Sequence, residues 1–150
     1  MRAVIQRVSS ASVVIDSVTK SSISTGLLIL LGVEVNDTAD DAEKLAAKIP
    51  KLRIFNDASG QMNLSCSDVG GDYIVVSQFT LHAETRKGNR PSYIHAARPE
   101  QAVPLYEKFL ELLAKEAGRS IQSGEFGADM KVSLVNDGPV TICIDTKNWI

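Results

Sequence analysis

Short apolar segments dominate the pattern of this chain and predict strands more often than helices. Residues 2–8 and 11–18 alternate apolar and polar positions, which predicts two strands joined by a tight turn at Ser9 and Ser10. Residues 26–35 are almost continuously apolar, which predicts a buried strand. Further strands are predicted from similar runs at residues 52–55, 72–81, 130–136 and 139–146.

Two segments carry helical spacing instead. Residues 36–38 (Asn-Asp-Thr) can cap a helix that ends at Pro50, and a second helix is predicted from about Glu100 to Ala117. Pro104 fits the second helix only near its first turn, because a deeper proline would remove a backbone hydrogen bond. Strands that mostly follow one another, with two main helices, predict an α+β fold with antiparallel or mixed β-sheets curled into a barrel-like core.

Length and composition predict one ordinary globular domain, residues 1–150. The apolar fraction is 44% and the charged fraction 23%. No apolar run reaches the roughly 18 residues of a membrane span. The first residues predict a strand rather than a signal peptide, so we expect a cytoplasmic protein without membrane contact.

The net charge of −2 argues against broad, nonspecific binding of nucleic acid. A local basic surface remains open, although a solvated loop is the simplest interpretation of the four basic residues Arg86, Lys87, Arg90 and Arg98. Cys66 and Cys143 form neither a disulfide framework nor a metal-ligand spacing, and we expect both to be reduced, inert and apolar in role.

Candidate chemistry gathers in two segments where predicted strands end. Residues 77–81 (Ser-Gln-Phe-Thr-Leu) follow one strand, and residues 136–141 (Asn-Asp-Gly-Pro-Val-Thr) join two others, with a hairpin turn expected at 136–139. Both offer hydroxyls, amides and backbone rather than metal ligands or thiols. The peptide before Pro139 is one that can be cis at low cost.

Conventional nucleophilic catalysis finds little support in these residues. A triad at Ser77 would need a nearby histidine, but we expect His82 and His95 to be loop or surface residues, and the chain has no Gly-x-Ser-x-Gly elbow. The Thr80 hydroxyl either bonds a neighbouring carbonyl or serves as a nucleophile without a visible base.

Both segments resemble the signature motifs of the D-aminoacyl-tRNA deacylases, the D-tyrosyl-tRNA deacylase family. The resemblance covers the whole chain and has no departure inside either motif. It extends to residues 5–8 (Ile-Gln-Arg-Val), 31–33 (Leu-Gly-Val), 53–55 (Arg-Ile-Phe), 62–63 (Met-Asn), 90–92 (Arg-Pro-Ser) and 126–130 (Phe-Gly-Ala-Asp-Met).

The resemblance implies hydrolysis of the ester that joins a D-amino acid, or glycine, to the 3′-terminal adenosine of a tRNA, without a cofactor or metal. It also implies a homodimer in which a cis Gly138-Pro139 turn of one subunit completes the pocket of the other and rejects L-amino acids. The residues it implicates are Ser77, Gln78, Phe79 and Thr80 in catalysis, and Gly138, Pro139, Arg7 and Met130 in substrate binding.

Two other functions stay open on the sequence. One is a non-catalytic module that binds tRNA 3′ ends, and the other is a small-ester hydrolase that uses Thr80. The group that activates water is also open, between Thr80 and the 2′-hydroxyl of the substrate ribose.

Overall fold

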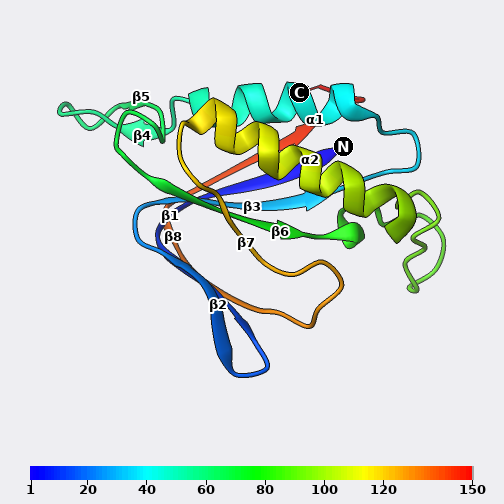
Figure 1. Ribbon diagram of the computed structural model, residues 1–150. Helices are drawn as coiled ribbons and strands as arrows, with labels where there is room; N and C mark the ends of the chain where they lie inside the picture. The colour runs from blue at the N-terminus through cyan, green and yellow to red at the C-terminus, as the bar shows by residue number, and fades with distance from the viewer. Residues whose placement is uncertain (150) are drawn as a thin grey trace.

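A computed structural model describes residues 1–149 and shows two helices side by side over one face of a curled sheet (Figure 1). The strands are β1 (Arg2–Ile15), β2 (Val18–Ile23), β3 (Gly26–Gly32), β4 (Phe55–Asn56), β5 (Met62–Leu64), β6 (Asp72–Ser77), β7 (Gln122–Ser123) and β8 (Lys131–Asp145). The helices are α1 (Ala39–Lys48) and α2 (Pro99–Ala117), and short 3-10 turns are η1 (Ile49–Lys51) and η2 (Phe79–His82).

The main sheet has the order β2-β1-β3-β6-β7, with β8 paired to β1. β1 pairs with β8 along nearly its whole length, so β3 and β2 must share its other edge one after the other. This arrangement makes the sheet fold over itself. The predicted α+β fold with a mixed, barrel-like sheet and two main helices is therefore confirmed.

Two predicted turns are wrong, for one shared reason. Ser9 and Ser10 lie inside the continuous strand β1, and residues 136–139 lie inside the continuous strand β8. The chain reverses after β1 at Asp16 and Ser17 instead, where φ is 49° and 65°. Small polar residues favour turns locally, but here long-range pairing between β1 and β8 holds them in a strand.

Several predicted strand ends also shift. The strand from residue 26 ends at Gly32, the strand at 52–55 is reduced to Phe55–Asn56, and the strand at 72–81 ends at Ser77. Each lost end is replaced by a loop or a 3-10 turn. The most important change is the last, because it places the 77–81 segment in a turn rather than in a strand.

The helices follow their predicted signals closely. A reciprocal capping box between Thr38 and Asp41 starts α1, and Pro50 lies in the 3-10 turn that follows it. Gly118, with a φ of 67°, ends α2. Pro104 lies in the second turn of α2, deeper than expected, so the carbonyl of Glu100 has no helical amide partner.

The core has a layer on each face of the sheet. One cluster lies between the sheet and the helices and includes Ile29, Leu45 and Phe109. A second lies inside the fold of the sheet and includes Val13 and Ile74. Burial on both faces explains the nearly continuous apolar sequence of β3. Within the described residues, neither helix has the length and apolar character needed to span a membrane.

Candidate active site

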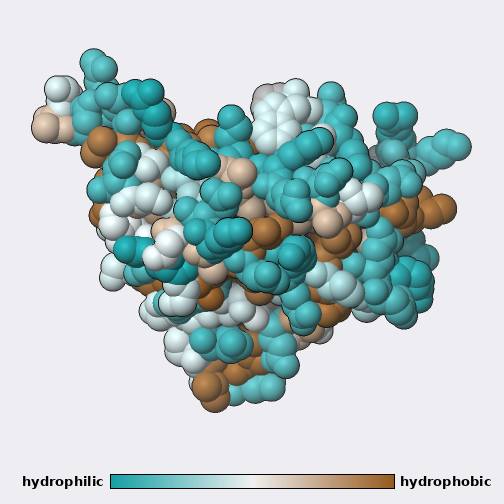
Figure 2. All heavy atoms as spheres, turned by 45° about the horizontal axis from the view of Figure 1, so that its top comes forward, coloured by the Kyte–Doolittle hydropathy of each residue, from teal (hydrophilic) through white to brown (hydrophobic). Residues whose placement is uncertain are grey.

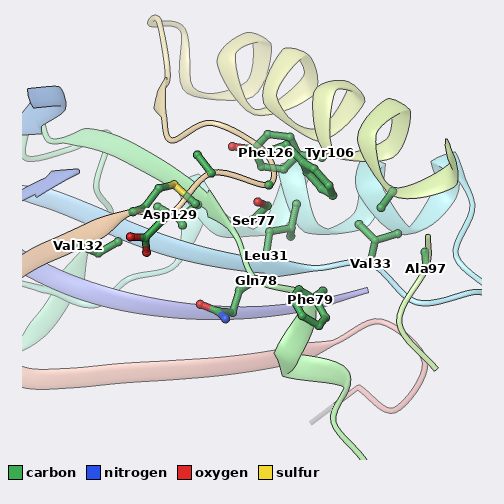
Figure 3. A pocket seen from close by; sticks show the side chains of 15 residues that line it. Leu31, Val33, Ser77, Gln78, Phe79, Ala97, Tyr106, Phe126, Asp129 and Val132 are labelled. Carbon is green, nitrogen blue, oxygen red and sulfur yellow. The ribbon is translucent and has the colours of Figure 1, made fainter. Parts of the chain in front are cut away.

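A cavity of about 320 Å³ opens beside the end of β6, between the sheet, the start of α2 and the chain that leads into β8. Figure 3 shows its labelled side chains, with Gln78 and Phe79 on one side, Tyr106 and Phe126 on the other, and Ser77 between them. The full lining is Leu31, Val33, Val76, Ser77, Gln78, Phe79, Ala97, Ala102, Tyr106, Phe126, Gly127, Ala128, Asp129, Met130 and Val132.

Three residues of the 77–81 segment, Ser77, Gln78 and Phe79, line this cavity. The Gln78 N–H donates to the Leu31 carbonyl at 2.8 Å, which ends the pairing of β6 with β3, and the chain then enters η2. The amides of Phe79 and Thr80 begin η2, where a helix leaves N–H groups without internal partners. Among residues 1–149 the structure gives these two amides no backbone acceptor outside the turn. They are therefore available to a bound group.

Thr80 is not among the residues that line the cavity. Gln78 donates from Nε2 to Thr80 Oγ1 at 2.5 Å. A donor of this kind stabilises the hydroxyl oxygen as an acceptor and does not remove its proton. The geometry therefore does not activate Thr80 as a nucleophile.

The far end of η2 is held by groups on β1 and β3. Arg2 donates from Nη1 to the Leu81 carbonyl at 2.8 Å and pairs through Nε with Asp145 at 2.6 Å. His82 packs so closely under Gly32 that a Cβ there would lie 3.0 Å from the His82 ring. These contacts set the position of the turn from its C-terminal side.

The expectation that His82 is a loop or surface residue is wrong, since only 3% of it is exposed. Burial lowers its pKa, which keeps the ring neutral near pH 7. Its Nε2 has no hydrogen-bond partner among the described residues, and its ring does not line the cavity. His82 therefore forms no triad with Ser77. His95 is exposed, as expected.

The opposite wall combines α2 with residues 126–130. Tyr106 donates to the Val75 carbonyl at 3.1 Å and packs edge-on against Phe126 with ring centroids 5.9 Å apart. Burial raises the pKa of Tyr106 to about 12, so its hydroxyl is a fixed donor rather than a base. Sequence reasoning identified Met130 on this wall but missed Tyr106, whose position in the apolar stripe of a helix gives no sign of a pocket.

Arg7, Gly138 and Pro139 form a separate cluster away from the cavity. The Gly138-Pro139 peptide is cis, as expected, and it lies in a bulge between the partner pairs Val8↔Asn136 and Gln6↔Thr141. The strand that carries it is separated from β6 by β1 and β3. Val132, near the start of β8, lines the cavity, but Gly138 and Pro139 do not. The turn therefore lies outside the cavity of its own subunit.

Arg7 braces the bulge from beneath. Only 6% of it is exposed, and its guanidinium donates to the carbonyls of Asp137 and Ile54, each at 2.8 Å, and to Asn56 Oδ1 at 3.3 Å. At Gly138, with a φ of 135°, a Cβ would lie 2.9 Å from Arg7 Nη2. Glycine is thus required both by the backbone and by the close approach of the arginine.

The amide side chains of Asn136 and Gln6, to which the sequence analysis assigned no role, also hold the bulge in place. Asn136 Oδ1 accepts from the Val140 N–H at 2.9 Å, which closes the bulge on itself. Asn136 Nδ2 and the Thr141 hydroxyl both donate to Gln6 Oε1, at 2.6 and 2.5 Å. The turn is therefore held on β8 and on β1 at once.

Metal-ligating and thiol groups do not gather at either cluster. Within residues 1–149 no group of three or more His, Cys, Asp or Glu side chains could hold a metal ion. Both cysteines are free, and burial raises the pKa of Cys66 to about 11, which suppresses its thiolate. Cys143 is exposed, so its expected role as a buried apolar residue is wrong.

Comparison with known proteins gives the family of this fold and site. The model of the family described as D-Tyr-tRNA(Tyr) deacylase matches residues 4–145. The chain is 60% identical to a D-aminoacyl-tRNA deacylase of Bacteroides thetaiotaomicron and 59% identical to one of Flavobacterium johnsoniae, each over 99% of both chains. The chain is therefore an ester hydrolase by class, and it belongs to the D-Tyr-tRNA(Tyr) deacylase family, as its motifs predict.

Two solved structures share the fold. One is described as the c-Myc DNA unwinding element binding protein, with a TM-score of 0.91 and 42% identity over 97% of this chain and 99% of that one. The other is described as a probable eukaryotic D-amino acid tRNA deacylase, with a TM-score of 0.81 over 95% of this chain and 97% of that one. Its identity of 16% makes it evidence for the fold alone.

Proposed function

We propose that this protein hydrolyses the ester between a D-amino acid, or glycine, and the 3′-terminal adenosine of a tRNA, and rejects L-aminoacyl-tRNA. One observation carries the proposal: Ser77, Gln78 and Phe79 line a cavity without an activated nucleophile, and the adjoining backbone amides of Phe79 and Thr80 have no backbone acceptor outside η2 among residues 1–149. Family membership supports the same reaction. A substrate of this kind places the protein with the translation machinery, in the cytoplasm.

The amides of Phe79 and Thr80 would stabilise the negatively charged tetrahedral intermediate of ester hydrolysis. When water attacks the ester carbonyl, its oxygen becomes an oxyanion, and preformed backbone donors bind that charge without rearrangement. The ester bond then breaks, and the 3′-oxygen of the ribose leaves and takes up a proton. Removing one such donor in other enzymes typically costs about 10²- to 10³-fold in rate.

The substrate's own 2′-hydroxyl is the better candidate for activating water. Thr80 Oγ1 accepts from Gln78, Tyr106 and Tyr73 have their pKa values raised by burial, and His82 lies outside the cavity lining. Gln78, at the mouth, is suited to hydrogen-bond the terminal ribose. This assignment leaves the protein to position and select rather than to transfer protons.

The functional unit in this proposal is a homodimer. The cis Gly138-Pro139 turn is held by Arg7, but neither residue of the turn lines the cavity of its own subunit. If the turn entered the cavity of a partner subunit, the contacts of Arg7 would hold it in a fixed position against the substrate. Its carbonyls would accept from the substrate amino group and occupy the volume that an L side chain needs, while Met130 would pack near the amino acid.

Single-turnover hydrolysis of matched tRNA esters tests the proposal. D-Tyr, D-Asp and Gly esters should all be cleaved, with rates that differ far less than the ratio between D and L forms. A steric clash of about 3–4 kcal/mol corresponds to roughly 10²- to 10³-fold discrimination. Binding without ester loss would indicate a non-catalytic 3′-end module, and equal rates on free D-amino-acid esters would indicate a small-ester hydrolase.

Sedimentation velocity tests the assembly. A dimer at micromolar concentration is expected, and a monomer would contradict completion of the pocket by a second subunit. Cleavage of one D-amino-acid ester with glycine untouched would show that the cavity recognises side chains, and that the turn is not the selecting element.

A further inference from the structure

The loop between η2 and α2 differs in charge from the rest of the chain. Residues 83–98 hold four basic side chains and one acidic side chain, a net charge of +3. The rest of the chain holds 12 basic and 17 acidic side chains, a net charge of −5. A polyanion is therefore repelled by most of the protein and attracted at one place, which orients it as well as binds it.

This loop is a built surface rather than a free segment. Glu84 and Ser92 exchange backbone hydrogen bonds at 2.7 and 2.9 Å, so the residues between them form a closed hairpin. The second arm is tied beyond β3 by bonds from Val35 to His95 and from Ala97 to Val33. Since Ala97 also lines the cavity, the hairpin is fixed relative to the candidate active site.

The hairpin presents three exposed cations, of which one is paired with an acidic neighbour. Arg86 lies 3.7 Å from Glu84, and among residues 1–149 no ion pair is formed by Lys87 or Arg90. At the edge of the molecule where this loop lies, on the right in Figures 1 and 2, hydrophilic side chains project beside a hydrophobic patch. Charged and apolar groups thus share one surface.

An aromatic pair connects this surface to the cavity. Phe79, which lines the cavity, is 55% exposed, and Tyr93 on the hairpin arm is 39% exposed. Their rings pack edge-on with centroids 5.1 Å apart. Exposed aromatic faces beside cationic side chains are the combination that binds unpaired nucleotides, with bases on the rings and phosphates on the cations.

We infer that this surface, made of Phe79, Tyr93, Arg86, Lys87 and Arg90, binds the unpaired nucleotides that precede the terminal adenosine of the tRNA. The inference rests on the proposed function for its ligand. The order of groups is that of the substrate: the aminoacyl ester at the cavity, bases on the aromatic pair, and phosphates along the hairpin. The surface would thereby let the protein bind aminoacyl-tRNA in preference to small esters, which lack phosphates.

Binding of uncharged tRNA to the full-length protein tests the surface directly. The variant Arg86→Gln/Lys87→Gln/Arg90→Gln should bind at least about tenfold more weakly at low salt. Each lost phosphate contact should make the slope of log K against log[salt] shallower by roughly 0.7. A matched control, Lys20→Gln/Lys44→Gln/Lys115→Gln, removes the same charge from other exposed positions and should change neither quantity.

Tyr93 supplies the stacking test. Tyr93→Ala should weaken binding roughly 5- to 150-fold, the effect of losing one stacked base, whereas Tyr93→Phe should bind like the wild type. A tRNA trimmed of its unpaired 3′ nucleotides should bind the wild type weakly and should no longer distinguish these variants. Equal binding of trimmed and intact tRNA would overturn the inference.

Catalysis provides a second, independent measurement. For D-tyrosyl-tRNA the charge variant should lower kcat/KM with kcat unchanged, and its rate on D-tyrosyl adenosine should equal that of the wild type. Equal losses on both substrates, or equal losses in the lysine control, would also overturn the inference. If the wild type cleaves neither ester, the proposed function fails, while the tRNA-binding measurements still decide whether the surface exists.

Discussion

Replacement of Arg7 by alanine is the most informative perturbation of the Gly138-Pro139 turn, which we propose selects chirality, because Arg7 holds the turn without lining the cavity. Its guanidinium donates to two backbone carbonyls at 2.8 Å, and it is almost completely buried. Hydrogen bonds from charged groups contribute about 1.5–3 kcal/mol each, so the two short bonds together represent about 3–6 kcal/mol. That range is comparable to the steric clash needed for strong discrimination.

We expect Arg7→Ala to lose the rigid position of the turn. In single-turnover hydrolysis of D- and L-tyrosyl-tRNA, the ratio of the two rates should fall at least tenfold, or activity on both should be lost. The melting temperature should also fall, since about 3 kcal/mol corresponds to roughly 6–12 °C in a domain of this size. Arg7→Lys should be intermediate, because an ammonium group cannot reproduce the planar fork of a guanidinium.

Arg119 offers a matched control within the same chain. Its Nη1 donates to the Gly70 and Gly71 carbonyls and to Asp72 Oδ1, at 3.1, 2.6 and 2.7 Å, and so braces a different turn from a more exposed position. Arg119→Ala should lower the melting temperature and leave the D/L ratio unchanged. A folded Arg7→Ala protein that keeps the wild-type ratio would refute the role of Arg7 in holding the selecting turn.

Three further outcomes are expected. Thr80→Ala should retain much of the activity, because Thr80 Oγ1 accepts from Gln78 and has no base beside it; a loss of about 10⁴-fold, with an aminoacyl adduct on Thr80 in the mass spectrum, would indicate a nucleophile. Extensive chelation should leave the single-turnover rate unchanged, since the described residues offer no group of metal ligands; a loss restored by one divalent ion would contradict this. Burial opposes the Asp41 carboxylate, but hydrogen bonds led by that from Thr146 lower its pKa below the ordinary 3.8. Its stabilising effect is therefore present above about pH 4 and lost as the pH falls through the lower folded value, so calorimetry should show the wild type and Asp41→Asn converging in melting temperature below pH 4.

Much of the fold could be predicted because its helices carry local signals. Thr38, Pro50 and Gly118 mark helix ends through chemistry that involves only neighbouring residues. The wrong predictions concern segments whose structure depends on contacts with residues far away in the sequence. Asn136 and Gly138 favour a turn locally, but pairing with β1 converts the expected hairpin into a bulge within one long strand.

The candidate site shows the same division. The 77–81 and 136–141 segments could be identified from motif resemblance, and the cis peptide was an open expectation from the Gly-Pro pair. The separation of the two clusters within one subunit followed only from the resemblance, because the residues that line a cavity depend on tertiary packing that local sequence does not reveal. The burial of His82 depends on its packing under Gly32, a contact between residues 50 positions apart in the chain.

Under the proposed function, a backbone wall selects chirality better than a side chain does, because displacing the backbone costs more free energy than changing a rotamer. A side chain that blocks an L-amino acid can leave its rotamer at a cost of about 0.5–1.5 kcal/mol, which limits discrimination to roughly tenfold. The Gly138-Pro139 turn can yield only if the bonds from Arg7, or the Asn136 and Gln6 contacts on the other side, break as well. Breaking them costs several kcal/mol, so the wall can support discrimination of 10²-fold or more without touching the D side chain. Under this proposal, the same rigidity would let glycine and chemically different D-amino acids share one cavity, since none of them would meet the wall.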